Sequence, residues 1–273
     1  MNRENRGILK HVILLDKPET LTSMQCVERV KKTIGARKAG HSGTLDPKVT
    51  GLMIIALDEA LKAMPVFLGM DKEYEGIIHL HSSVSLTEFR KAASGFVGQI
   101  TQRPPVRSAV ARIPRKRTVH SFRIMGKSGR DVLFRVRCEA GTYIRKLCSD
   151  IGESLGSGAH MASLRRTGIG GFSVKEAVTM ERIEKEKVKC LIPLENALER
   201  AGLKRVEIKE SSVRKVGNGL PVRWEDVEKA DRGIKPGEVV GIYSGSRIIA
   251  LGMAQKDYPE GRNMFKTDRV FRK

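Results

Sequence analysis

The chain has 273 residues, 40% hydrophobic and 30% charged, which is enough to bury a core and to form one large domain or a large and a small one. Lysine and arginine exceed acidic residues by 20 along the whole chain, an excess that repels itself unless phosphates neutralise it, so nucleic acid is favoured over a merely solvated basic surface. The apolar runs are too short to span a bilayer and the polar segment Met1–Lys10 is no signal peptide, which excludes a membrane protein and predicts a cytoplasmic one.

The first part of the chain predicts two strands and two helices. Val12–Leu15 is a short apolar run ending at Asp-Lys-Pro, where proline stops ladder pairing. A helix is expected at Ser23–Ile34. Leu52–Leu57 is a continuous apolar run, which suits a strand buried on both faces. Asp58 then begins a short helix that Pro65 kinks or ends.

The middle of the chain predicts a helix and then a strand. Ser85 and Glu88 have the spacing of a capping box, and apolar residues recur at helical intervals from there to Gly98. Val132–Cys138 alternates apolar side chains with mostly charged ones. That alternation predicts a strand with one apolar face.

The next predicted helix places a cation at the edge of a cleft. Thr142 can cap this helix. Its apolar stripe consists of Ile144, Leu147, Cys148, Ile151 and Leu155. At about 100° per residue, Lys146 points away from the stripe and Arg145 lies at its border. We therefore expect Arg145 to look along a cleft edge.

The last part of the chain has a different composition. Leu194–Ala201 predicts a helix, after which Gly202 marks a boundary. A short helix and β-rich sequence follow, in which Val239–Tyr243 and Arg247–Leu251 flank Ser-Gly-Ser, a hairpin signal. We predict one domain over residues 1–202 and a small β-rich domain over residues 203–273.

Neither the cysteines nor the histidines predict a metal site. The four cysteines form no C-x-x-C pair and no zinc or disulfide spacing, so we expect reduced, buried thiols. His79 and His81 share one face of a probable strand, but no third ligand has a recognisable spacing, which favours a structural pair. The glycines of 168–171 lack the strand and the lysine of a phosphate loop. No metal and no cofactor are expected.

The densest cluster of special residues is Gly40–Gly51, which reads Gly-His-Ser-Gly-Thr-Leu-Asp-Pro-Lys-Val-Thr-Gly and leads into the buried strand. Taken alone, Asp46-Pro47 is better explained as a turn or a helix start. However, residues 41–51 resemble the signature loop of the tRNA pseudouridine synthase and dyskerin family. Further segments match in that family's order: Leu15–Ser23, Lys72–Tyr74, Arg103–Ala109, Ala140–Leu147 and Leu164–Phe172.

Within this family the chain resembles the dyskerin-like archaeal type, which serves box H/ACA guide-RNA particles. Arg107–Ala109, Asp150–Gly152 and Gly158–Met161 carry this finer match. It implies a catalytic subunit that works with guide RNA, target ribosomal RNA and small accessory proteins. A stand-alone synthase for the T-loop uridine of tRNA is the alternative, and one protein can do both. A non-catalytic RNA-binding scaffold is a third reading.

The resemblance implies which residues carry the chemistry. The reaction breaks the N1–C1′ bond of uridine, turns the uracil and joins C5 to C1′. Asp46 would start it by attacking C1′ or C6 or by promoting glycal formation, routes that remain open. Arg145 would pair with Asp46 and lower its pKa, unless it is an ordinary surface arginine. Tyr74 would stack on the flipped uracil, with a core aromatic as the alternative.

Other matched residues are expected around the pocket or on the RNA. Lys17 would shape the pocket floor, either close to the carboxylate or, as the favoured role, as a structural support that holds a backbone carbonyl. His41 would stack where the flipped base leaves or would only donate and accept hydrogen bonds. Tyr143 and Arg165 belong to matched motifs and are expected to bind substrate RNA. Arg107 belongs to a basic cluster around two prolines that would grip the RNA backbone: Arg103, Arg107, Arg112, Arg115, Lys116 and Arg117.

We therefore expect an α+β protein with the pseudouridine synthase fold. Its catalytic domain would hold a mixed, mainly antiparallel sheet with Asp46 in a basic central cleft. The C-terminal region resembles the PUA domain, a small β-rich RNA-binding module, in Gly237–Tyr243 and Ile249–Ala254. Only a short segment precedes the first motif, whereas dyskerin-like proteins have a longer extension there, which implies a trimmed or differently supported PUA domain.

Overall fold

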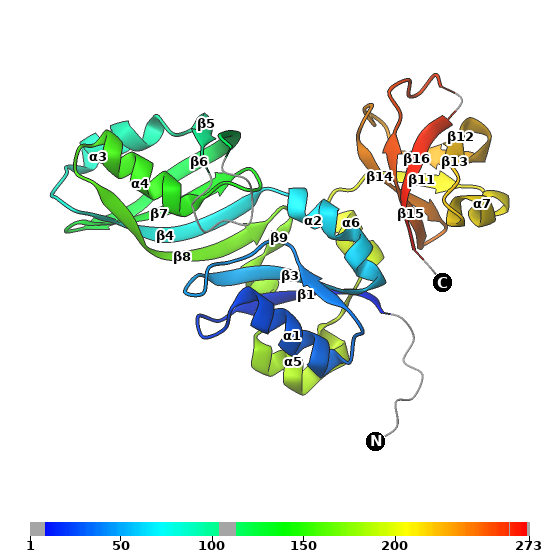
Figure 1. Cartoon of the computed structure of the whole chain (residues 1–273), viewed down its shortest axis with the longest axis horizontal. Helices are drawn as coiled ribbons and strands as arrows, with labels where there is room; N and C mark the ends of the chain where they lie inside the picture. Colours follow the sequence, from blue (N-terminus) through cyan, green and yellow to red (C-terminus); the bar gives the residue numbers. More distant parts are fainter. Residues whose placement is uncertain (1–8, 104–112, 262, 272–273) are drawn as a thin grey trace.

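Two β-sheets organise the chain in the computed structural model, which describes residues 9–103, 113–261 and 263–271 (Figure 1). The first sheet contains β1 (Lys10–Lys17), β2 (Ala39–His41), β3 (Thr50–Asp58), β4 (Lys72–Leu80), β5 (Gly98–Gln102), β6 (Arg115–Ser128), β7 (Asp131–Cys138), β8 (Ala159–Ile169), β9 (Phe172–Ser173) and β10 (Ile192–Pro193). Its strand order is β10-β1-β3-β8-β4-β7-β6-β5, with β2 beside β3 and β9 beside β8.

This sheet is mixed and mainly antiparallel, as the sequence predicted. Its parallel pair among the described strands is β3 with β8, where Thr50 lies opposite Arg165 and Gly51 opposite Arg166. This short seam joins the two halves of the sheet. The strands expected at Val12–Leu15 and Leu52–Leu57 are confirmed within β1 and β3, and every residue of that second run is buried.

Helices α1 (Ser23–Ile34) and α5 (Met180–Glu186) cover one face of β1 and β3. The predicted bounds of α1 are confirmed. Thr22 and Gln25 form a capping box at its start, and Gly35 ends it in the left-handed conformation with φ 78°. Because the apolar side chains of α1 pack on β1, this helix fixes the strand that carries Lys17.

Helices α3 (Leu86–Ser94) and α4 (Ile144–Ser154) cover the other end of the sheet, over β4, β6, β7 and β8. The capping box of Ser85 and Glu88 and the strand at Val132–Cys138 are confirmed. The predicted cap of α4 is wrong: Tyr143 holds the N-cap position, and the Thr142 hydroxyl donates 2.7 Å to the Glu139 carbonyl. The Thr142 side chain is thus used by the preceding turn.

In the segment after β3, the short helix expected to begin at Asp58 is confirmed, but the role expected for Pro65 is wrong. A 3-10 helix, η1 (Glu59–Ala63), leads into α2 (Met64–Gly69), and Pro65 lies in the first turn of α2. Pro65 therefore starts a helix, because a proline lacks only an N–H that the first turn leaves unpaired anyway. The other 3-10 helices are η2 (Val174–Glu176), η3 (Lys187–Cys190), η4 (Glu210–Ser212) and η5 (Trp224–Asp226).

The second sheet contains β11 (Arg205–Ile208), β12 (Val222–Arg223), β13 (Val227–Ala230), β14 (Val239–Ser244), β15 (Arg247–Ala254) and β16 (Asn263–Val270), with a short helix α7 (Val213–Gly217). Its order is β12-β16-β15-β14-β11-β13. The predicted hairpin is confirmed, since β14 and β15 pair antiparallel. The boundary expected between residues 202 and 203 lies in the connection from α6 (Leu194–Arg200) to β11.

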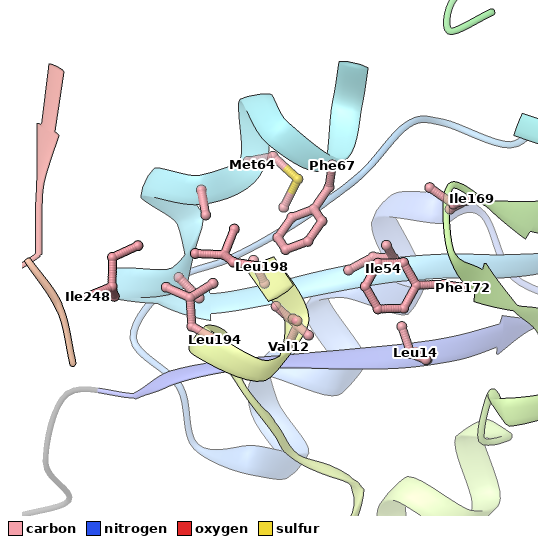
Figure 2. Packing of buried hydrophobic residues seen from close by; sticks show 14 of the residues in the cluster. Val12, Leu14, Ile54, Met64, Phe67, Ile169, Phe172, Leu194, Leu198 and Ile248 are labelled. Atoms are coloured by element: carbon pink, nitrogen blue, oxygen red, sulfur yellow. The ribbon is translucent and has the colours of Figure 1, made fainter. Parts of the chain in front are cut away.

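A shared hydrophobic cluster joins the two sheets. Phe67 of α2 and Leu198 of α6 pack over β1 and β3, as Figure 2 shows. Ile248, Leu251 and Phe271 of the second sheet region belong to the same cluster. The second sheet is therefore packed against the first part of the chain and also has a core of its own.

The four cysteines are free and buried, as expected. Among the described residues, no helix is both long enough and apolar enough to cross a membrane.

Candidate active site

The Asp46 loop connects β2 to β3, and buried hydroxyl groups hold the part of the loop that precedes Asp46. The Ser42 hydroxyl accepts a hydrogen bond from the Ile54 amide at 3.2 Å. The Ser23 hydroxyl donates 3.0 Å to the Leu45 carbonyl and accepts 2.9 Å from the Leu45 amide. These bonds fix the backbone on one side of Asp46, and its other side is fixed from β1.

Lys17 supplies that second anchor. Its ammonium group is fully buried and donates hydrogen bonds of 2.9 Å to the carbonyls of Pro18, Pro47 and Val49. Burial lowers the pKa of Lys17, and the three carbonyls satisfy the three donors of the ammonium group. Of the two roles expected for Lys17, these contacts favour structural support of the loop over a contact with the carboxylate.

Arg145 forms an ion pair with Asp46, the pairing that the family resemblance implied. The start of α4 is fixed by the Gln102 side chain, which accepts 2.9 Å from the Tyr143 amide and donates 3.1 Å to the Tyr143 carbonyl. The side chains of Asp46 and Arg145 are 50% and 60% exposed. The carboxylate is therefore open to solvent.

Tyr74 of β4 belongs to the same hydrophobic cluster as Leu45, the residue before Asp46, and is almost completely buried, with 8% of its surface exposed. Its ring packs in the core with Leu45 and Val49, which is the alternative that the sequence left open. Its hydroxyl accepts a hydrogen bond of 3.3 Å from Nε of Arg166. Burial raises the pKa of Tyr74, so the hydroxyl is a neutral phenol at neutral pH.

Arg166 is the residue that the sequence reasoning missed. It lies on β8, is 3% exposed, and its guanidinium contacts the Asp46 loop as well as Tyr74. The adjacent pair Arg165-Arg166 was visible in a matched motif. Alternation along a strand puts the two side chains on opposite faces, but only the pairing of β8 with β3 and β4 decides which one faces Tyr74.

His41 and Arg165 both make contacts within the protein. The Nδ1 atom of His41 accepts 3.2 Å from the Gly43 amide, which requires the unprotonated ring nitrogen. Burial, together with the nearby Arg166 charge, lowers the pKa of His41. Arg165 donates to both carboxylate oxygens of Asp16, at 3.0 and 2.6 Å, and to the Thr50 hydroxyl. RNA contacts of either residue remain predictions.

The predicted RNA-gripping cluster is only partly described. Arg107 and Arg112 lie outside the described residues. Arg115 and Lys116 are exposed at the start of β6, and Arg117 pairs with Glu139 at 3.6 Å. The exposed part of this cluster is available to phosphate groups.

Three of the histidines form side-chain contacts where the end of β4 pairs with the start of β8. The Nδ1 atom of His79 lies 2.6 Å from Asp131, and Nε2 of His81 lies 3.0 Å from Nδ1 of His160. Within the described ranges, no three histidine, cysteine or acidic side chains are grouped to hold a metal ion.

The site thus combines a carboxylate, a paired guanidinium and a buried phenol in a protein of net charge +20. The model of the TruB family pseudouridylate synthase N-terminal domain matches residues 31–144, and that of the tRNA pseudouridylate synthase B C-terminal domain matches residues 145–199. A probable tRNA pseudouridine synthase B of Methanopyrus kandleri is 43% identical, over 96% of this chain and 80% of the relative. The corresponding protein of Methanocaldococcus jannaschii is 39% identical, over 97% of this chain and 82% of the relative.

Solved structures are similar over almost the whole chain. A crystal structure of a Cbf5-Nop10-Gar1 complex contains a chain with TM-score 0.87 and 38% identity, matched over 96% of this chain and 85% of that one. A structure of an H/ACA RNP bound to a substrate RNA containing 2′-deoxyuridine gives TM-score 0.85 and 36% identity, over 97% and 86%. With the fold and the site, these matches define an RNA pseudouridine synthase, an enzyme that isomerises uridine within RNA. Within that class, the chain belongs to the TruB family.

Proposed function

We propose that Asp46 is the catalytic carboxylate of this uridine isomerase, with Arg145 as its charge partner and Tyr74 beside the uracil. The observation that carries this assignment is the ion pair of Asp46 with Arg145, two residues 99 positions apart that the fold brings together. Leu45, the neighbour of Asp46, belongs to the same hydrophobic cluster as Tyr74. The guanidinium of Arg145 holds the Asp46 carboxylate in place through the ion pair. A carboxylate that stays ionised can stabilise or attack an electron-poor sugar carbon.

The balance of the reaction defines what these residues have to do. The electrons of the N1–C1′ bond leave with the uracil, so C1′ becomes electron-poor and the base carries negative charge. After the base turns, C5 bonds to C1′, C5 loses its proton and N1 gains one. Asp46 serves the first half of this sequence by attack at C1′, by attack at C6, or by promoting a glycal. The phenol of Tyr74 serves the second half, near the C5 proton.

Access to this site requires the target nucleotide to leave its stack. A base inside a helix cannot reach an enzyme pocket without being flipped out. The half-exposed side chains of Asp46 and Arg145 leave room for such a nucleotide, and bound RNA would then exclude water. His41, Tyr143, Arg107 and Arg165 are the residues that we propose to hold the RNA around it, and Lys17 is the support of the loop.

We further propose that the enzyme is the catalytic subunit of an H/ACA guide-RNA particle acting on ribosomal RNA. The similarity to chains solved in such particles supports this, because it extends over the second sheet and not only over the catalytic half. In this proposal residues 203–273 form the PUA domain, which binds guide RNA, and small accessory proteins complete the particle. The names of the archaeal relatives favour a second candidate, a synthase that modifies tRNA directly.

A tritium-release assay separates these candidates. RNA labelled at uracil C5 is offered as tRNA transcript alone, or as guide RNA with matched target and accessory proteins, to wild type and to Asp46→Asn. We expect release with the guide mixture that the variant abolishes. Release from bare tRNA would favour the direct tRNA enzyme. Tight RNA binding without release from any mixture would leave only a non-catalytic scaffold.

A further inference from the structure

The guanidinium of Arg166 forms hydrogen bonds with three parts of the site, which are the Asp46 loop, strand β3 and the Tyr74 hydroxyl. Its Nε donates 3.3 Å to the Tyr74 hydroxyl on β4. One terminal nitrogen donates to the carbonyls of Gly43 and Leu52 at 3.2 and 3.4 Å, and the other donates to the Thr44 carbonyl at 3.3 Å. One planar group thus bonds the Asp46 loop, strand β3 and the phenol at once.

Arg166 carries its charge into the interior without a carboxylate partner among the described residues. It is 3% exposed, and the acceptors that bond it are three carbonyls and one phenol. A second cation, Lys72, is buried nearby, and burial followed by the charge of Arg166 lowers the pKa of Lys72 to about 8. Buried charges are costly, and replacing them with apolar residues of similar volume is often neutral or stabilising. Packing alone is therefore a poor explanation for an arginine here.

The backbone at this point is built for the same close approach. Gly51 lies opposite Arg166 on the parallel seam, with φ 107°. A Cβ atom added to Gly51 would lie 2.2 Å from the Arg166 carbonyl oxygen. The pairing of β3 with β8 therefore fixes the main chain of Arg166 against β3. The side chain of Arg166 fixes the Asp46 loop, which precedes β3.

We propose that Arg166 is a positioning residue for uridine isomerisation that acts through the Tyr74 hydroxyl. The Nε–H of Arg166 occupies one lone pair of the phenol oxygen, so the hydroxyl proton points away from Arg166. The charge of Asp46 also acts on Tyr74, which places the carboxylate within electrostatic range of the phenol. By holding the Gly43 and Thr44 carbonyls as well, the same group fixes Asp46 and Tyr74 relative to each other. This inference rests on the roles proposed above for Asp46 and Tyr74.

A double-mutant cycle tests the coupling. Wild type, Arg166→Met, Tyr74→Phe and the double variant are compared in single-turnover tritium release at saturating RNA. Tyr74→Phe removes only the hydroxyl and keeps the ring in the core. If Arg166 works through that hydroxyl, each single variant slows release by about tenfold or more, and the double variant stays within about threefold of the slower single variant. RNA affinity should be unchanged in all four proteins.

Independent action would overturn the proposal. In that case the two slowing factors multiply in the double variant. Loss of RNA affinity with an unchanged rate at saturation would overturn it too. If Arg166→Met does not fold, the cycle is run with Arg166→Lys, which keeps the charge but has only three donors for the four acceptors that Arg166 bonds, the phenol and three carbonyls. Partial recovery of the rate in Arg166→Lys relative to Arg166→Met is expected where both fold.

Arg135→Met is the matched control. Its guanidinium pairs with Glu75, the neighbour of Tyr74 on β4, and so lies on the opposite face of the same sheet. If wild type is active but the slowing factors of the two single variants multiply in the double variant, only the role of Arg166 is contradicted. Wild type that releases no tritium from any RNA contradicts the proposed function itself, so the two failures are distinguishable.

Discussion

Gly51→Ala is the change that most directly tests the seam between the two halves of the first sheet. The added Cβ would lie 2.2, 2.7 and 2.9 Å from the O, N and C atoms of Arg166, and a backbone cannot swing aside as a side chain can. Gly51 also has φ 107°, which costs a residue with a Cβ roughly 1–3 kcal/mol. Relief of the contact would separate β3 from β8 and weaken ladder hydrogen bonds of about 1 kcal/mol each.

We therefore expect Gly51→Ala to lower the free energy of unfolding by about 3 kcal/mol or more, a large part of the roughly 5–15 kcal/mol that domains have. Urea unfolding followed by circular dichroism measures this loss. Gly126→Ala on β6 is the control, because nothing lies within 4 Å of its added Cβ, and its stability should stay near that of wild type. The reasoning is refuted if Gly51→Ala unfolds at the wild-type urea concentration and keeps wild-type activity.

Two further predictions concern buried lysines. Lys17→Met leaves three carbonyls of the Asp46 loop region unsatisfied and should lower the free energy of unfolding, measured in urea, by about 3 kcal/mol. The exposed control Lys48→Met should change it little. Equal urea midpoints for the two variants would contradict this. Because the pKa of Lys72 is lowered from 10.5 to about 8, the unfolded chain holds a proton that the folded chain has lost between these pH values. The stability of wild type relative to Lys72→Met should therefore rise from pH 8 to pH 10.5, and a flat difference across that window would rule out the lowered pKa.

Much of the local structure could be predicted from the sequence because its causes are local. The run Leu52–Leu57 is apolar at every position, which suits a strand buried on both faces, and β3 is that strand. The capping box at Ser85 and the stripe of α4 likewise depend on neighbours within a few residues. The cap expected at Thr142 and the helix end expected at Pro65 were wrong, because a side chain or a proline that suits one local role can be used in another.

The candidate site was accessible to prediction through motifs rather than through physics. The motif match pointed to Asp46 and Tyr74, and helix periodicity put Arg145 at a cleft edge. The resemblance also implied that Arg145 pairs with Asp46, which no local pattern could give, since their contact spans 99 positions of the sequence. Composition could say only that a polyanion is the favoured partner.

The sequence by itself determined the periodicities, the capping box of α3, the excess of positive charge and the loop that carries Asp46. Only the tertiary structure decided which of two adjacent arginines faces Tyr74, which carbonyls Lys17 binds, and why position 51 has a glycine. The reason is physical: each of these follows from the register of β8 against β3 and β4, and a shift of one residue turns every side chain of a strand to the other face. That register is set by the packing of segments more than 80 residues apart, so no local pattern records it.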